Sequence, residues 1–441
     1  MRTLGLFSCL LVCFQYAIAQ TPNQALELPS LDDMGIDLDG ELFAEEAPRT
    51  KWYDAIIPTL AYQSGLSLYE PGELTSHRFD IRLRGEHLTQ RAYFFRMDGK
   101  LITRLPGDDQ LASNESLDWD GRLREVFVQK GVDNWTLTFG FQNFAWGEMD
   151  AAQIADVITP RDYSEFAFTT PEDARLGQLL LNYQIYFASS QWQFLYSPWP
   201  QTNRYPGGSA SSLLEFVSSE PIQFDNHQPA FLDDYELAMQ WKSSQTGRDI
   251  SIMLASLLAN DPLFEELPTN NNEKHYRTKY SRFNMLAATI NQSDANFLWK
   301  GEMAFKQNLG LGGLSPEFHD ALETAIGFDF DANGAWSATV ELFNQHIFLG
   351  TDDLPGFEQN NTQLLARWSK QWLNQTLTSI YFFSYQLQNR DNVHSFSLNY
   401  ALSDNWLMDL NATLFDSPEP DSPGQLTKNW DQLTFRISFT Y

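Results

Sequence analysis

Cysteine and long hydrophobic runs are nearly missing from this sequence. Both cysteines, Cys9 and Cys13, lie in the first 19 residues, so we expect no thiol and no disulfide once an export signal is removed. No later segment approaches the roughly 18 consecutive apolar residues that a membrane-spanning helix requires. No stretch rich in proline, glycine and serine divides the chain, which argues against domains joined by a flexible linker.

Basic residues are also scarce, with 29 lysines and arginines against 57 aspartates and glutamates and a net charge of -28. Phosphate binding needs a basic surface, so nucleic acid is excluded as a partner. The carboxylates would suit a lumen that prefers cations, or loops at a cell surface rich in divalent cations. Solubility of exposed loops explains the same excess.

Spacings typical of catalytic and metal sites are absent. The seven histidines form no zinc-binding H-x-x-x-H or H-E-x-x-H motif, and no G-x-S-x-G elbow occurs. We therefore expect no catalytic residue, metal or cofactor. Asp352 with Asp353, and the acids around Asp416, could hold calcium or bridge lipopolysaccharide phosphates, but solvated loop acids need no such function.

The first 19 residues have the pattern of a secretory signal. Arg2 precedes an apolar run, and Ala17 with Ala19 forms a small-residue cleavage motif, so the mature chain is expected to begin at Gln20. Acylation of Cys13 in a lipoprotein is the alternative. The residue before Cys13 is not small, which favours cleavage after residue 19.

The end of the chain alternates strictly between apolar and polar residues. The apolar set is Leu433, Phe435, Ile437, Phe439 and Tyr441. In an exported chain that ends on an aromatic residue, we expect this face to meet lipid rather than a protein core. The pattern resembles the closing strand of bacterial outer-membrane β-barrels, and we expect Phe435, Ile437, Phe439 and Tyr441 to form the membrane insertion signal. An edge strand of a soluble sandwich is the alternative.

Eighteen strand-like runs can be traced from residue 56 to the end, with sixteen as the alternative number. They are expected at 56–68, 76–87, 91–104, 119–130, 134–144, 174–187, 191–198, 234–243, 248–258, 277–290, 296–307, 320–331, 335–347, 361–372, 375–387, 393–402, 405–416 and 429–441. Short turns alternate with long loops, which is typical of a transmembrane antiparallel up-and-down β-barrel with periplasmic turns and extracellular loops. Alternation also reconciles 14% aromatics with a mean hydropathy of -0.37. The fold class is therefore all-β, with residues 51–441 as the barrel.

The same alternation predicts which side chains face the lumen. Phe79, Phe139 and Phe305 are expected outside, and tryptophans near the short turns are expected at the headgroup level. Charged side chains are expected inside, where they would make a wet, polar lumen: Arg78, Asp80, Arg82, Arg84, Lys300, Glu302 and Lys306. The run around Arg124 does not sort cleanly, which suggests a bulge or buried ion pairs.

Two segments are expected to modify the barrel. Residues 20–50 are acidic with scattered apolar residues and are interpreted as a mobile periplasmic segment, or as a short helix that docks on a partner or enters the barrel mouth. Residues 145–173 form a long loop with unusual apolar content, so we expect it to fold inward and narrow the pore. A cap packed on itself above the membrane is the alternative. The expected constriction residues of this loop are Glu148, Asp150, Asp156, Arg161 and Asp162.

Four motifs within 122–175 strengthen the assignment. They are R-L-R-E-x-F at Arg122, a W-x-L-x-x-G strand, W-G-E-x-D at Trp146 and D-V-I-x-P-R-D at Asp156. Together they resemble a family of uncharacterised proteobacterial outer-membrane barrels, porin-like and often encoded beside resistance-nodulation-division exporters. The layout is also distantly similar to the alginate-export barrel, although the acidic composition argues against an anionic polysaccharide. The resemblance implies a transport role.

These observations lead to three functional hypotheses. The first is an outer-membrane channel for small polar or cationic solutes, in contact with membrane lipids and lipopolysaccharide and inserted by the barrel assembly machinery. The second is an outer-membrane component of an export system, with residues 20–50 contacting a periplasmic or exporter partner. The third, a barrel-embedded hydrolase, would need Ser395 with His394 or His346 near one rim.

Overall fold

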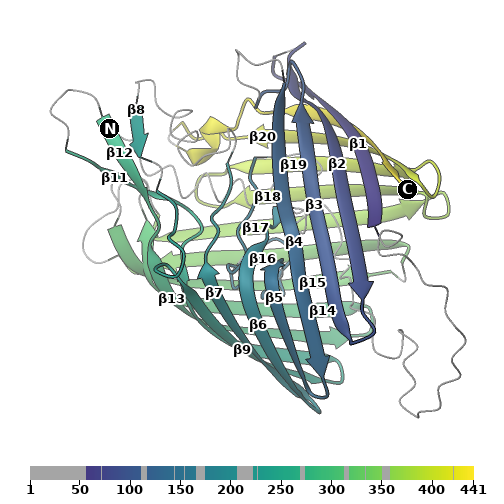
Figure 1. Ribbon diagram of the computed structural model, residues 1–441. Coiled ribbons are helices and arrows are strands. Elements are labelled where there is room, and N and C mark those ends of the chain that lie inside the picture. The colour runs from purple at the N-terminus through teal and green to yellow at the C-terminus, as the bar shows by residue number, and fades with distance from the viewer. Residues whose placement is uncertain are drawn as a thin grey trace, which may run out of the picture.

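The computed structural model shows one closed barrel of eighteen antiparallel strands (Figure 1). Each strand pairs with its neighbour in the chain, and β1 pairs with β21 to close the ring. This confirms the all-β fold and the preferred strand number. The structure describes residues 56–70, 72–110, 117–143, 145–152, 154–164, 174–205, 222–225, 227–268, 274–311, 317–332, 334–349, 358–420 and 422–441. The predicted signal at 1–19 and the acidic segment at 20–50 lie outside this part.

The barrel strands agree closely with the predicted runs. They are β1 (Ile56–Ser67), β2 (Leu74–Leu88), β3 (Tyr93–Arg104), β4 (Asp118–Val132), β5 (Trp135–Gln142), β6 (Gln178–Phe187), β7 (Ser190–Trp199), β9 (Glu236–Gln245), β10 (Arg248–Leu258), β13 (Arg282–Asp294), β14 (Phe297–Leu311), β15 (Glu317–Asp331), β16 (Trp336–Ile347), β17 (Asn360–Trp372), β18 (Leu377–Gln386), β19 (Asn392–Ala401), β20 (Trp406–Asp416) and β21 (Gln432–Thr440). Figure 1 shows the front strands crossing the back strands steeply, as strand tilt in a barrel requires.

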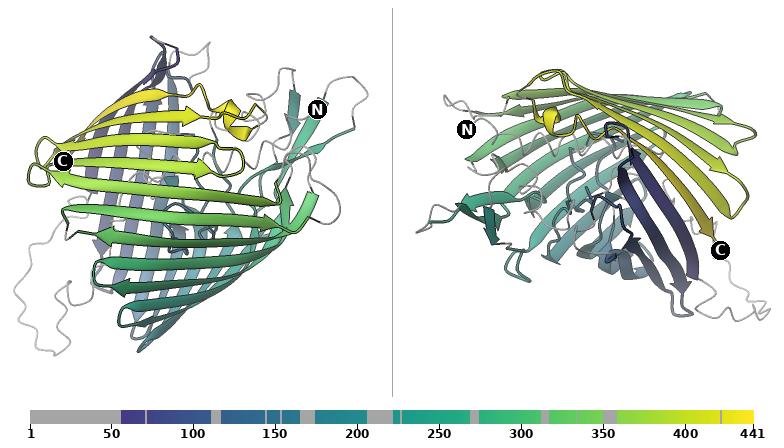
Figure 2. Two further views of the ribbon diagram at one scale, coloured as in Figure 1. Left: turned by 180° about the vertical axis from the view of Figure 1, so that it is seen from behind. Right: turned by 90° about the horizontal axis from the view of Figure 1, so that it is seen from above.

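Short turns and long loops lie at opposite ends of the barrel, as the sequence predicted. The short turns use left-handed backbone, for example at Gly247 (φ 73°) and Gly334 (φ 77°), where glycine avoids the strain of a side chain. The long-loop end carries a small sheet that was not predicted, made of β8 (Ile222–Asp225), β11 (Leu263–Glu266) and β12 (Lys274–Lys279), visible beside the barrel in Figure 2. A 3-10 helix, η2 (Pro423–Leu426), lies in the last long loop. The predicted strand at 277–290 is divided between β12 and β13.

Arg124 interrupts the alternation of β4, as suspected from the sequence. Asp98 pairs with Glu125 and Gly99 pairs with Leu123, so Arg124 is an extra residue in a β-bulge. Arg124 and Glu125 consequently both lie buried. Glu125 pairs with Arg96 at 2.7 Å, so the irregularity contains a bulge and an ion pair together.

The outer face is an apolar belt. Phe79, Phe139 and Ile326 are 50%, 51% and 66% exposed, whereas a protein core would bury them. Trp336, Trp372 and Trp406 lie at strand ends by the short turns, which suits a membrane interface. Within the described residues, no helix has the length and apolar character needed to cross a membrane.

Candidate functional site: a loop clamped inside the barrel

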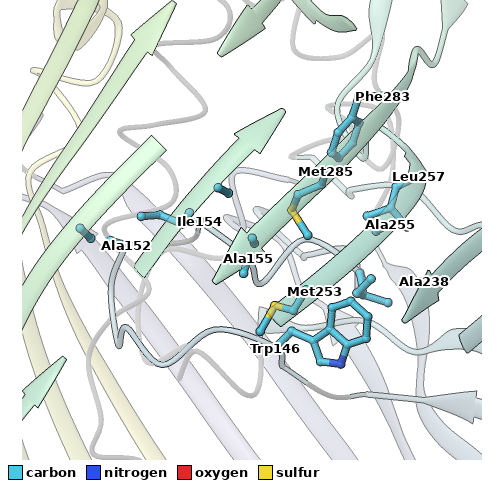
Figure 3. Packing of buried hydrophobic residues seen from close by; sticks show 14 of the residues in the cluster. Trp146, Ala152, Ile154, Ala155, Ala238, Met253, Ala255, Leu257, Phe283 and Met285 are labelled. Carbon is cyan, nitrogen blue, oxygen red and sulfur yellow. The ribbon is translucent and has the colours of Figure 1, made fainter. Parts of the chain in front are cut away.

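Residues 145–152 and 154–164, which follow β5, pack against the inside of the barrel. Trp146, Ile154 and Ile158 are at most 4% exposed and belong to one cluster with inward side chains of the wall. Figure 3 shows Trp146 and Ala155 beside β10 and β13. We call the inward side chains of this cluster the apolar wall: Leu180, Leu195, Ala238, Met253, Ala255, Leu257, Phe283, Met285, Ala287, Ala304, Ala325, Phe343, Leu365 and Phe382.

The apolar wall corrects the expectation of a lumen that is polar and wet all round. On β10, Ile252 and Leu254 face outward, while the alternate residues Met253 and Ala255 face inward and are buried by the loop. The outer apolar face of β10 belongs to the exposed belt, and its inner apolar face is covered by the loop. The loop therefore lies against a dry part of the wall.

Glu302 on β14 holds the first part of the loop. Its Oε2 accepts hydrogen bonds from the backbone N–H of Glu148 (3.1 Å) and Met149 (3.4 Å), and its Oε1 accepts one from Ala155 (2.6 Å). The side chain is 4% exposed. These three bonds close residues 148–155 around one carboxylate, which compensates for its removal from water.

Glu341 on β16 holds the turn of the same segment. Its Oε1 accepts from the N–H of Asp150 (2.7 Å), and its Oε2 accepts from Ala151 and Ala152 (3.0 Å each). Three successive amides pointing at one carboxylate form an anion-binding concavity of the kind that backbone nests make. Two glutamates on different strands thus fix the loop through its backbone, without requiring particular loop side chains.

Lys300 on β14 carries the compensating charge. Its Nζ lies 2.9 Å from Asp150, 2.9 Å from Asp329 and 3.5 Å from Glu341. Glu148 at the other edge of the loop contacts Lys242 (3.4 Å) and Asn291 (2.6 Å). The loop acids Glu148 and Asp150 therefore meet the wall directly.

Asp156 anchors the return of the loop toward β6. Its Oδ2 accepts from Arg175 Nη2 at 2.7 Å and also pairs with Arg161. Burial acts to raise the pKa of the Asp156 carboxyl, but the charges of Arg175 and Arg161 outweigh burial and hold this pKa below its usual value. Asp156 is therefore an anion at neutral pH, and the loop is tied to the start of β6.

Asp162 and Ser164 join the loop to β4 and to the preceding loop. Arg122 Nη1 lies 2.6 Å from Asp162, and Arg122 Nη2 donates to Ser164 Oγ at 3.0 Å. Gln110 of the β3–β4 loop also donates to the Ser164 carbonyl. Part of the β3–β4 loop consequently lies beside the inward loop.

A second loop, residues 200–205, supports the first and was not predicted from the sequence. The N–H of Arg161 donates to Asn203 Oδ1 (2.7 Å), and the N–H of Tyr163 donates to the Arg204 carbonyl (2.8 Å). Tyr205 donates to Asp261 (2.7 Å), and burial raises the pKa of this carboxyl. No local pattern signals these contacts, because each partner is an ordinary loop residue.

The inner face of β2, β3 and β21 differs from the apolar wall. We call its charged side chains the charged wall: Arg78, Asp80, Arg82, Arg84, Glu86, Arg96, Asp98, Lys100, Arg104 and Arg436. Arg82 donates to Asp98 at 2.6 and 2.8 Å, and Asp80 lies 3.2 Å from both Lys100 and Arg436. Arg78 donates to Asp108 of the inward β3–β4 loop at 2.9 Å. Arg84 is exposed, and the side chains of Arg82 and Arg436 are 23% and 20% exposed.

Four predicted or considered residues lie elsewhere. Lys306 pairs with Glu323 on β15 at 2.6 Å rather than with the loop. His394 faces outward and contacts Tyr381 (2.7 Å), while Ser395 next to it is buried on the inner face. His346 is outward and bonded to Asn360. The side chains considered for a hydrolase are therefore not brought together.

No known family model matches the sequence, and no curated protein matches it. The fold is nevertheless shared with solved structures. Acinetobacter baumannii OccAB3 has a TM-score of 0.52 at 9% identity, covering 88% of this chain and 98% of its own. Pseudomonas aeruginosa OccK5 (OpdH) has 0.53 at 8%, covering 87% and 97%. The outer membrane protein opdK from Pseudomonas aeruginosa has 0.51 at 9%, covering 88% and 98%. The chain thus has the fold of these barrels.

Proposed function

We propose that this protein is a channel of the bacterial outer membrane for small polar solutes, with an aperture set by the loop that follows β5. The observation that carries the proposal is the pair of clamps at Glu302 and Glu341, which together accept six backbone N–H groups of that loop. An eighteen-stranded barrel is wide enough for a water-filled channel, so a wall-anchored loop is what narrows it. The apolar belt and the shared fold support the membrane location.

The charged wall indicates which charge the preferred solute carries. The apolar wall lies on β6, β7, β9, β10 and β13 to β18, so we assign the remaining passage to the opposite side of the barrel, where β2, β3 and β21 carry the charged wall. Cationic side chains outnumber carboxylates in the charged wall, and a wall of one predominant sign concentrates solutes of the opposite sign. We therefore favour anionic over cationic solutes, although the net charge of -28 led us to expect cations. The net charge counts every residue of the chain, including all loops. A solute in the passage is affected mainly by the side chains that line the passage.

Planar-bilayer recordings of the purified protein test both parts of the proposal. Discrete conductance steps are expected, and the reversal potential in a salt gradient should have the sign of an anion-preferring pore. An absence of conductance from correctly folded barrel would refute the channel. A cation-preferring reversal potential would refute only the solute assignment.

The export hypothesis remains a prediction. It depends on residues 20–50, which lie outside the described part, and on an exporter as neighbour in the genome. Deleting 20–50 should alter coupling to such a partner and leave the open pore unchanged. A deletion that instead opens the pore would make this segment the constriction.

A further inference from the structure

The outer face of the barrel carries an apolar groove of about 610 Å³, which is within the roughly 300–1,000 Å³ typical of ligand sites. It crosses β6, β7, β9, β10, β13 and β14, and its floor and sides include Phe194, Leu237, Leu254, Leu286 and Phe305. These five side chains are between 37% and 52% exposed. The groove is therefore a hollow in the membrane-facing surface.

The groove lies in the half of the barrel that is nearer the long loops. Leu237 is the second residue of β9 after the loop, and Ser256 and Asn284 lie two residues from the loop ends of β10 and β13. Ser256, Asn284 and Gln307 give the groove polar groups there. A ligand in this position would have its apolar part toward the membrane centre and its polar part toward the loops.

Arg282 stands above this polar end. It shares the outward face of β13 with Asn284 and Leu286, and its Nη1 reaches Ser256 Oγ at 3.5 Å. Its Nη2 donates to the Tyr235 carbonyl at 2.6 Å, and its guanidinium lies 5.5 Å from the centre of the Tyr235 ring. Tyr196 packs beside Tyr235 at 6.3 Å. The guanidinium is thus held in place by a carbonyl and an aromatic ring.

Arg282 also forms no direct ion pair with a carboxylate of the described residues. Among the described residues, no aspartate or glutamate oxygen lies within 4.0 Å of its guanidinium, whereas Arg78, Arg82 and Arg436 of the charged wall each lie against an aspartate. A positioned guanidinium at a membrane surface binds phosphate through charge-assisted hydrogen bonds. Glu236 lies near enough to act on Arg282 through its charge, but its oxygens accept from Gln178 and the Leu258 N–H and form no ion pair with Arg282.

We propose that this groove and Arg282 form a binding site for a phosphorylated glycolipid of the outer leaflet, with an acyl chain in the groove and a phosphate on Arg282. Tyr196 and Tyr235 add hydroxyl groups near the headgroup. The inference rests on the proposed membrane location, with the long loops outward, and not on transport. A failure of lipid binding would therefore leave the channel proposal intact.

Native mass spectrometry of the detergent-purified protein tests the site. Titration with diphosphorylated lipid A should show about tenfold weaker binding for Arg282→Gln, the effect of losing hydrogen bonds from a charged group. Arg282→Lys should retain most of the binding, and lipid A without phosphates should bind the native protein as weakly as it binds Arg282→Gln. Arg248→Gln is the matched control, because Arg248 is an outward cation at the short-turn end of β10.

Heat-modifiable migration verifies that each variant is folded. If Arg282→Gln does not fold, Ser256→Trp provides a second test, because an indole would fill the polar end and should weaken binding similarly. Equal binding by the native protein and a folded Arg282→Gln would overturn the proposal. So would equally tight binding of phosphatidylglycerol, since the groove would then accept any anionic lipid.

Discussion

The apolar wall and the charged wall belong to the same barrel, and the strands of both have an apolar outer face. Their inner faces differ, because one packs against the loop and the other carries charged side chains. On β10 and β13, the inward residues Met253, Met285 and Phe283 are almost completely buried beneath the loop. On β2 and β21, inward positions hold Arg82, Arg84 and Arg436, which retain some exposure. The outer face of a strand is set by lipid, whereas the inner face is set by whatever the barrel encloses.

The comparison also explains how the loop can be held firmly inside the barrel. Apolar contacts provide a non-directional driving force for burial. The hydrogen bonds to Glu302 and Glu341 then fix the position of the loop backbone on the wall. The charged wall is a poorer docking surface, because each arginine that a loop covers needs a carboxylate partner, as Asp108 provides for Arg78. The difference between the two walls therefore places the loop against the apolar side of the barrel.

The largest expected effect comes from removing the loop. Replacing Ala151–Thr159 by a short Gly/Ser splice should raise single-channel conductance severalfold and weaken ion selectivity, because the segment that covers the apolar wall is gone. Single-channel recordings measure both quantities. Conductance equal to that of the native protein would mean that the aperture is set elsewhere.

The next prediction compares the outer and inner faces directly. Phe139→Arg places a charge on the lipid-facing side of β5 and should cost about 2–4 kcal/mol of barrel stability, as arginine does near the bilayer midplane. Arg82→Gln, on the inner face, should cost much less. Denaturant unfolding in lipid vesicles measures the difference, and equal losses would show that the assigned faces are wrong.

A smaller effect is expected when one clamp is removed. Glu341→Ala leaves the amides of Asp150, Ala151 and Ala152 without their acceptor, which should weaken loop docking by about 1–3 kcal/mol. Amide hydrogen exchange of residues 150–152 should then be faster. Glu323→Ala is the control, since Glu323 pairs with Lys306 and Gln345 instead of the loop. Unchanged exchange in Glu341→Ala would contradict the clamp.

The smallest effect should follow from neutralising part of the charged wall. Arg82→Gln combined with Arg84→Gln should shift the reversal potential toward that of a cation-preferring pore. This shift should be smaller than the one caused by the loop deletion. Lys370→Gln is a useful control, because Lys370 lies over Trp372 on the outer face and cannot meet a solute in the passage. A shift of the same size in Lys370→Gln would argue against solute contact with the charged wall.

The strand number, the short turns and the outward faces could be predicted because each depends on a few consecutive residues. Alternation on β2, as in Phe79, Asp80 and Ile81, needs no knowledge of the rest of the chain. The break at Arg124 was also visible locally, since a bulge disturbs a two-residue period. Even the inward loop could be inferred, because its apolar content is inconsistent with a solvated position.

Only the tertiary structure decided what lies inside. Glu341 and the amide of Asp150 are 191 residues apart, and nothing near Glu341 distinguishes it in sequence from Glu323. The inner face of β10 could not be assigned from the sequence, because Met253 between Ile252 and Leu254 makes an uninterrupted apolar run with no period to read. Sequence fixes a strand's two faces when only one of them is apolar. When both faces are apolar, the inner face is defined only after the barrel has closed and the loop has packed against it.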